Sequence, residues 1–385
     1  MQLNNLFSNM QPTPMLRILG ASAKYAGPTP LVSLGIGEPD QDTDPRIVAA
    51  ADQAARQGFT HYPPVGGFPD LKAAIAKYWK DKYGLEAGAD NVIVGAGATQ
   101  AIHMIMAVTL NPGDEVIIPS PFFGPYQQAV EYVYGKVVTV DTHEEDGFNI
   151  TAEALEKAIT PKTKMLLLNS PGNPTGSLLS REEALKICEV VKKHNLILMS
   201  DEVYEAFLFE GAHTCLATLP GMNERTFTIG SFSKTYAMCG WRVGYAIGPV
   251  AAINAAKMVN IGTTMGSTAN AQKAALFAIE NCNDFARDMV VEYKKRRDYV
   301  VERANSIKGL SCRTPKGAFY AFINIRGTGL KSMDFSLMLL EKAGVVTMPG
   351  VAFGQAGDDY IRVAYTIPIP QLKTAFDNIE KALNA

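Results

Sequence analysis

Short apolar runs alternate along the chain with longer stretches of helical periodicity. The runs that predict strands are Asn91–Val94, Glu115–Pro119, Lys136–Val140, Met165–Asn169, Leu196–Ser200 and Thr226–Gly230. Gln100–Leu110 and Ser180–His194 are predicted helices, and Ser180 with Glu183 resembles a capping box. Strands made almost wholly of apolar residues are typical of sheets buried on both faces, which helices must cover. The pattern therefore predicts an α/β domain with a mainly parallel sheet.

The two ends of the chain have a different pattern. Residues 1–45 read as irregular and rich in Pro, Gly and Asp. Beyond Asp284, the predicted elements are a helix over Phe285–Ile307, strands around Gly317–Ile325 and Tyr360–Ala364, and a helix over Pro370–Leu383. We expect both ends to form one smaller α+β domain, 1–45 with 284–385, beside a large domain over 46–283.

Composition excludes several classes of protein. The 385 residues carry 36 Lys and Arg against 38 Asp and Glu, so neither a nucleic acid nor a membrane surface is an expected partner. No signal peptide opens the chain, and no apolar run reaches the roughly 20 residues that span a bilayer. The five cysteines are scattered without a CxxC pair, which is typical of reduced thiols. We therefore expect a cytoplasmic protein.

Polar side chains gather in four segments, three of which directly follow a predicted strand. These segments are Asn169–Gly176, Ser200–Tyr204, Ser231–Lys234 and Gly240–Gly244. Because ligands of open α/β sheets bind at the carboxyl ends of strands, we expect these groups to converge on one crevice. The segments contain neither histidine nor cysteine, which argues against an acyl-transfer triad and against a metal site.

Lys234 is the centre of the predicted chemistry. A lysine becomes a nucleophile near neutral pH when a nearby cation or an apolar environment favours its neutral amine. Arg242 and the aromatic residues around Lys234 supply both conditions. Asp201 is the acid that could lie under a pyridinium nitrogen, so the pattern points to pyridoxal phosphate.

A phosphate group needs donors, and the turn Gly95–Thr99 offers them. It follows a strand and opens a helix, where main-chain N–H groups and the helix dipole favour an anion. The turn lacks the third glycine of a dinucleotide-binding loop and the Lys of an ATP-binding loop. With Ser231, Ser233 and Arg242 it would form a cup for one phosphate monoester.

Taken together, the motifs resemble those of the fold-type I pyridoxal-phosphate aminotransferases of class I/II, the aspartate-aminotransferase-like family. The matching stretches, in order, are Gly35–Asp40, Tyr62–Pro69, Asn111–Glu115, Asn173–Gly176, Ser200–Tyr204, Ser231–Lys234, Gly240–Gly244 and Pro349–Gly354, with Arg362 near the end. The resemblance covers nearly the whole chain. It implies a large domain with a mainly parallel, seven-stranded sheet and a smaller domain built from both termini.

The resemblance also implies a role for each site residue. Lys234 would form the Schiff base with pyridoxal 5'-phosphate and move the substrate proton, Asp201 would hold the ring nitrogen, and Tyr204 would bind the ring oxygen. The other residues implied to bind the cofactor are Gly97, Ala98, Thr99, Phe123, Asn173, Ser231, Ser233, Arg242 and, from a neighbouring subunit, Tyr62. The residues implied to bind the substrate carboxylate are Arg362, Gly37 and Asn173. Phe123 stands where the family usually has Trp or Tyr, so the ring contact would lack a hydrogen bond.

The predicted activity is transamination by a homodimer with shared active sites. An L-amino acid would donate its amino group, and a 2-oxo acid would accept it, in a ping-pong Schiff-base mechanism. Two alternatives remain: a lyase or cyclase on the same scaffold, and a non-catalytic sensor domain. A dicarboxylate donor would need a second cation, for which Arg17 and Lys24 are candidates. Residues expected near the site slightly favour an apolar or aromatic donor, with a specialised biosynthetic substrate as an equal alternative. These residues are Leu16, Ile36, Phe122 and Phe123.

Overall fold

A computed structural model describes residues 13–384, which form two compact units. The larger unit comprises Glu38–Lys295 and Pro315–Phe319. The smaller unit comprises the described residues up to Gly37, then Arg296–Thr314 and the chain from Tyr320 onward. Residues 38–45, 284–295 and 315–319, which the sequence placed in the smaller domain, group with the larger unit in the structure. The domain bounds 46–283 stay a prediction.

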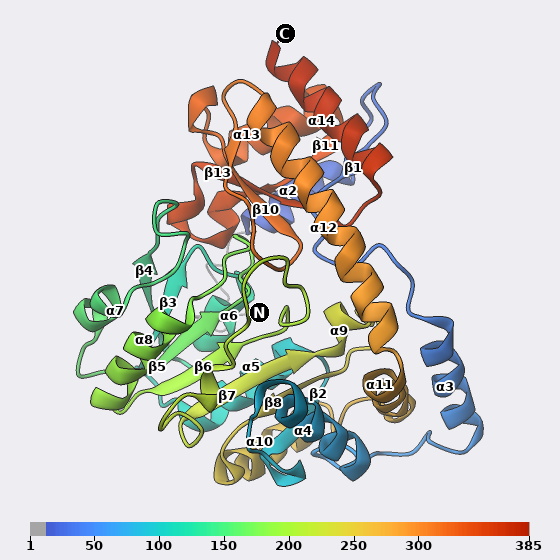
Figure 1. The fold of residues 1–385 in the computed structure, drawn as a ribbon, viewed down its shortest axis with the longest axis vertical. Coiled ribbons are helices and arrows are strands. Elements are labelled where there is room, and N and C mark those ends of the chain that lie inside the picture. The colour runs from blue at the N-terminus through green and yellow to red at the C-terminus, as the bar shows by residue number, and fades with distance from the viewer. Residues whose placement is uncertain (1–12, 385) are drawn as a thin grey trace, which may run out of the picture. The chain divides into compact units, whose positions relative to one another are not determined.

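A seven-stranded sheet forms the centre of the larger unit, in the order β2-β8-β7-β6-β5-β3-β4 (Figure 1). Its strands are β2 (Val92–Gly95), β3 (Glu115–Ser120), β4 (Lys136–Asp141), β5 (Thr163–Asn169), β6 (Ile197–Asp201), β7 (Thr226–Ser231) and β8 (Gly244–Ile247). β8 pairs antiparallel with both β2 and β7, and all other neighbouring strands of this sheet pair parallel. The mainly parallel α/β fold is thus confirmed. The pattern of apolar runs had located every strand of this sheet except β8.

Helices cover the sheet because its strands are apolar on both sides. The helices of the larger unit are α3 (Pro45–Arg56), α4 (Pro69–Tyr83), α5 (Ala98–Thr109), α6 (Pro125–Glu131), α7 (Ala152–Ala158), α8 (Arg181–Lys193), α9 (Phe232–Thr235), α10 (Val250–Thr263) and α11 (Ala269–Asn281). One core packs α4 and α11 against β2 and β8, and a second packs α7 and α8 against β5 and β6. The long helix α12 (Asn283–Ser306) contributes residues to both units.

The predicted capping box at the start of α8 is only half formed. The Ser180 hydroxyl accepts a hydrogen bond from the Glu183 N–H at 3.2 Å, as expected of an N-cap. The Glu183 carboxylate, however, accepts from the Ala152 N–H at 2.7 Å, at the start of α7. Glu183 therefore joins two helices that pack together, which no local pattern could indicate.

The smaller unit is an α+β arrangement. Its strands are β1 (Val32–Ser33), β9 (Ser311–Cys312), β10 (Tyr320–Asn324), β11 (Val345–Val346), β12 (Met348–Pro349) and β13 (Tyr360–Ala364). Its helices are α2 (Pro14–Ser22), α13 (Ser332–Met338) and α14 (Ile369–Asn384). The expectation of an irregular N-terminal segment was wrong for α2, whose start is capped by the Thr13 hydroxyl. No helix between residues 13 and 384 is long and apolar enough to cross a membrane.

Candidate active site

Asp201 is a buried carboxyl at the end of β6, with only 4% of its surface exposed. Its Oδ2 accepts a hydrogen bond from the Tyr126 hydroxyl at 2.5 Å, and its Oδ1 accepts from the Val203 N–H at 3.2 Å. Burial raises the pKa of Asp201 to about 6, although the Tyr126 bond and the nearby Lys234 charge act in the opposite direction. The site thus holds an acid that a neighbouring cation would keep ionised.

Lys234 lies on α9, directly after β7, where an α/β sheet presents its ligand-binding groups. Its Nζ is 3.7 Å from the Cys239 sulfur and 5.9 Å from the centre of the Phe319 ring. Phe319 also packs edge-on against Tyr204, with ring centres 5.3 Å apart. The lysine, the phenol and Asp201 therefore belong to the same end of the sheet.

A positively charged cup forms where α5 begins. Gly97 precedes the helix with a φ of 86° and has no side chain to cap it, while the Gln100 side chain accepts from the Ala96 N–H at 2.5 Å. The Arg242 guanidinium lies directly against the Gly97 Cα, so a Cβ there would overlap its Nη2. Arg242 is held by its bonds to the carbonyls of Cys239 (2.8 Å) and Ala96 (3.3 Å). The helix dipole and the guanidinium together favour an anion at this point.

The remaining residues predicted to line the cup lie at the start of α9, the helix that carries Lys234, and at the start of α5. Ser231 caps α9, because its Oγ accepts from the Ser233 N–H at 3.1 Å. Ala98 and Thr99 occupy the first turn of α5. A phosphate bound here would meet hydroxyl and main-chain donors as well as Arg242.

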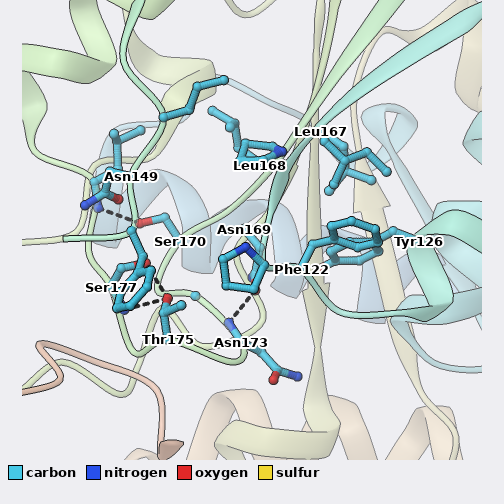
Figure 2. Close-up of a pocket in the computed structure, with 17 residues that line it drawn as sticks. Phe122, Tyr126, Asn149, Leu167, Leu168, Asn169, Ser170, Asn173, Thr175 and Ser177 are labelled. Carbon is cyan, nitrogen blue, oxygen red and sulfur yellow. Dashed lines mark hydrogen bonds between the residues drawn. The ribbon is translucent and has the colours of Figure 1, made fainter. Parts of the chain in front are cut away.

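The loop after β5 carries Asn173, which is 5% exposed. Its N–H donates to the Asn169 side-chain oxygen at 2.8 Å, and both residues line a small cavity with Phe122 and Tyr126 (Figure 2). Phe123 packs edge-on against Tyr126, with ring centres 5.5 Å apart. The predicted ring-stacking residue is therefore a direct neighbour of the phenol that binds Asp201.

Two predicted substrate residues lie in the smaller unit. Arg362 on β13 is 4% exposed, and its Nη2 donates to the Gly35 carbonyl at 2.6 Å. The rings of Tyr320 and Phe353 flank its guanidinium, at 4.5 and 4.9 Å from its central carbon. The Tyr320 hydroxyl donates to the Gly37 carbonyl at 3.4 Å. The structure thus places Gly37 and Arg362 around one tyrosine, while Asn173 belongs to the larger unit.

Tyr62 differs from the buried site residues in its exposure. Its side chain is 80% exposed, which is unusual for a tyrosine. It lines an open groove of about 750 Å³ with residues of the chain segment around Thr264–Asn270.

Comparisons with known proteins decide the family. The model of the family "Aminotransferase class I and II" matches residues 29–379. The chain is 38% identical over 387 residues to aromatic-amino-acid aminotransferase 2 of Thermococcus litoralis, covering 100% of this chain and 98% of that one. It is 41% identical over 362 residues to an aspartate aminotransferase of Pyrococcus abyssi, covering 93% of each. The crystal structure of the aspartate aminotransferase from Rhizobium meliloti superposes with a TM-score of 0.94 at 36% identity, covering 100% of this chain and 99% of that one.

The chain belongs to the aminotransferase class I and II family.

The predicted activity is therefore confirmed: this aminotransferase is an enzyme that carries out transamination, and the lyase or cyclase alternative is not favoured. Enzymes of this family use pyridoxal phosphate. The residues present suit that group, because a buried carboxyl, an amine and an anion cup occur in one unit. These three features match the ring nitrogen, the aldehyde and the phosphate, respectively.

Sequence reasoning assigned no role to two residues that the structure connects to the site. Tyr126 binds Asp201 across 75 positions, and Asn169 bonds to the main chain of both Asn173 and Asp201. Asn169 begins a segment already singled out for its polar residues, and Tyr126 lies three residues after Phe123. Their residue types were visible, but their partners depend on which strands are neighbours.

Proposed function

We propose that the aminotransferase binds pyridoxal 5'-phosphate in its larger unit, attached through Lys234. The observation that carries the proposal is Asp201: a buried carboxyl whose pKa lies near 6 and which Lys234 is close enough to influence. When bound, the cofactor supplies a ring that accepts the electron pair of the substrate Cα. Asp201 would keep the ring nitrogen protonated, and Tyr126 would hold Asp201 in place.

The other proposed contacts rest on the family resemblance and are supported by the positions of the side chains. Asn173 and Tyr204 would donate to the ring oxygen, and Phe123 would lie against the ring. The residues that would hold the phosphate are Gly97, Ala98, Thr99, Ser231, Ser233 and Arg242. Each is proposed from its place around the start of α5 and α9.

Lys234 would also act as the acid and base. Its Nζ would take the proton from the substrate Cα and deliver it to carbon C4′ of the cofactor, a role that requires the amine to be held in place. The Cys239 sulfur, 3.7 Å from the Nζ, and the Phe319 ring, whose centre is 5.9 Å from it, support such a placement. Arg362 would bind the substrate carboxylate with its planar guanidinium, assisted by Gly37 and Asn173.

We further propose a homodimer in the cytoplasm. The exposure of Tyr62 supports a role at the phosphate of the neighbouring subunit. All five cysteines lie within the described residues and are free thiols, which supports a reducing compartment. Aspartate and the aromatic amino acids are the first donors to test, because the relatives carry those names.

The test is a half-reaction. The cofactor-loaded enzyme is mixed with single amino acids in the absence of any oxo acid, and the visible absorbance of the cofactor is followed. A lasting loss of the band identifies the donor, whereas recovery of the band with release of pyruvate or ammonia would indicate elimination. Lys234→Ala should abolish turnover, and the exposed lysine variant Lys77→Ala should retain it. Turnover by Lys234→Ala would refute the proposal.

A further inference from the structure

Asn169 connects two loops of the site through a single side chain. Its Oδ1 accepts the Asn173 N–H at 2.8 Å, and its Nδ2 donates to the Asp201 carbonyl at 2.9 Å. The residue ends β5 and lies opposite Asp201 in the parallel pairing of β5 with β6. Figure 2 shows the bond between Asn173 and Asn169, beside the cavity that they share with Ser170.

We propose that Asn169 is a positioning residue, which sets the separation between the Asn173 loop and the end of β6. The inference rests on the proposed function, in which Asn173 and Asp201 contact opposite parts of one rigid ring. The atoms of such a ring have a fixed spacing, and site groups must match it within about 0.5 Å. Because the Asn169 amide bonds to the main chain of both residues, it transmits the position of one loop to the other.

The rest of the loop shows why this connection matters. Two of its other hydrogen bonds are internal: Gly172 N–H to Ser177 carbonyl at 2.9 Å, and Ser177 N–H to Thr175 Oγ1 at 3.3 Å. The Gly176 carbonyl accepts from the Lys316 and Gly317 N–H groups at 2.9 and 3.1 Å, and none of these four bonds reaches β6. Beside it lies a cavity of about 50 Å³, enough for a few water molecules. A loop that borders such a cavity can move without losing close packing. The Asn169 amide, with the Ser170 N–H that shares the Asp201 carbonyl at 3.2 Å, opposes that movement.

Three variants separate positioning from simple stability. Asn169→Ala removes both bonds. Asn169→Asp keeps an acceptor for the Asn173 N–H but turns a carboxylate oxygen toward the Asp201 carbonyl, so it breaks one connection and retains the fold of the loop. Ser177→Ala is the matched control, because it deletes a hydroxyl that lines the same cavity and accepts from the Thr175 hydroxyl of the same loop at 2.8 Å.

The readouts are the kinetics of the loaded enzyme and the pH midpoint at which its visible absorbance changes. Two neutral hydrogen bonds are worth about 1 kcal/mol each, which corresponds to a loss of roughly 30-fold in kcat/KM for Asn169→Ala. A donor such as the Asn173 amide favours an ionised ring oxygen, so loosening it should raise the pH midpoint by about 0.5 or more. Asn169→Asp should shift the midpoint in the same direction, and Ser177→Ala should leave it unchanged.

Each result decides between positioning and a purely structural role. A raised midpoint with reduced kcat/KM in both Asn169 variants, but not in Ser177→Ala, supports positioning. The proposal is overturned if Asn169→Ala has the wild-type pH midpoint and kcat/KM, or if Ser177→Ala shifts the midpoint equally. If Asn169→Ala does not fold, the measurements on Asn169→Asp decide alone. Wild-type enzyme and Lys234→Ala are measured alongside. If the wild type binds no cofactor, or if Lys234→Ala turns over, the proposed function has failed. If the wild type and Lys234→Ala behave as expected and the Asn169 variants have no effect, only the inference about Asn169 has failed.

Discussion

The buried carboxyl of Asp201 should make the cofactor-free enzyme less stable at neutral pH. Asp201→Asn removes the ionisable group while preserving the size of the side chain. The amide oxygen can still accept from the Val203 N–H, which reaches Oδ1 at 3.2 Å in the wild type. The substitution should therefore abolish transamination and yet stabilise the cofactor-free protein.

The magnitude follows from the pKa of the carboxyl. Burial raises it from 3.8 to about 6, so the folded protein holds this proton to a higher pH than the unfolded chain does. The free energy of unfolding must then fall as the pH rises from about 3.8 to about 6. A shift of about two units corresponds to roughly 3 kcal/mol. The variant should match the wild type near pH 4 and exceed it by roughly that amount at pH 8.

The assay is urea unfolding of both cofactor-free proteins between pH 4 and pH 8. Taking the difference between the two removes the titration of all other groups. Asp52→Asn, which alters a carboxylate that is 61% exposed, is the control and should not reproduce the stabilisation at pH 8. A pH-independent difference for Asp201→Asn, or a wild type more stable than the variant at pH 8, would refute the reasoning.

Two further predictions concern the anion cup and a buried carboxylate of the larger unit. Gly97→Ala should weaken cofactor binding more than 10-fold in an absorbance titration, because the new Cβ overlaps Arg242, whereas Gly113→Ala, with a similar φ of 90° and open space, should not. Glu205, which is 6% exposed, accepts from the Tyr78 hydroxyl at 2.6 Å and from Lys82 at 2.7 Å. Glu205→Gln should lower the free energy of unfolding by about 1–3 kcal/mol in urea, while the exposed Glu153→Gln should change it by less than about 0.5 kcal/mol. Equal effects within either pair would contradict the explanation.

Local patterns in the sequence determined most of the larger unit. Runs such as Met165–Asn169 are apolar throughout, and they became strands because a sheet covered on both faces buries every side chain. The order of motifs identified the family and singled out Lys234, Asp201 and Arg242. β8 was missed because its four residues carry no alternation that distinguishes a strand from a turn.

The tertiary structure decided which polar groups meet. Tyr126 reaches Asp201 only because β3 and β6 lie on either side of β5, which brings residues 75 positions apart within hydrogen-bond distance. Asn169 became a bridge because β5 pairs with β6 in the register that places it opposite Asp201. Even the pKa of Asp201 depends on burial by distant segments. Periodicity is a property of neighbours along the chain, whereas these contacts depend on strand order and register, and for that reason the sequence indicated the chemistry but not the arrangement that supports it.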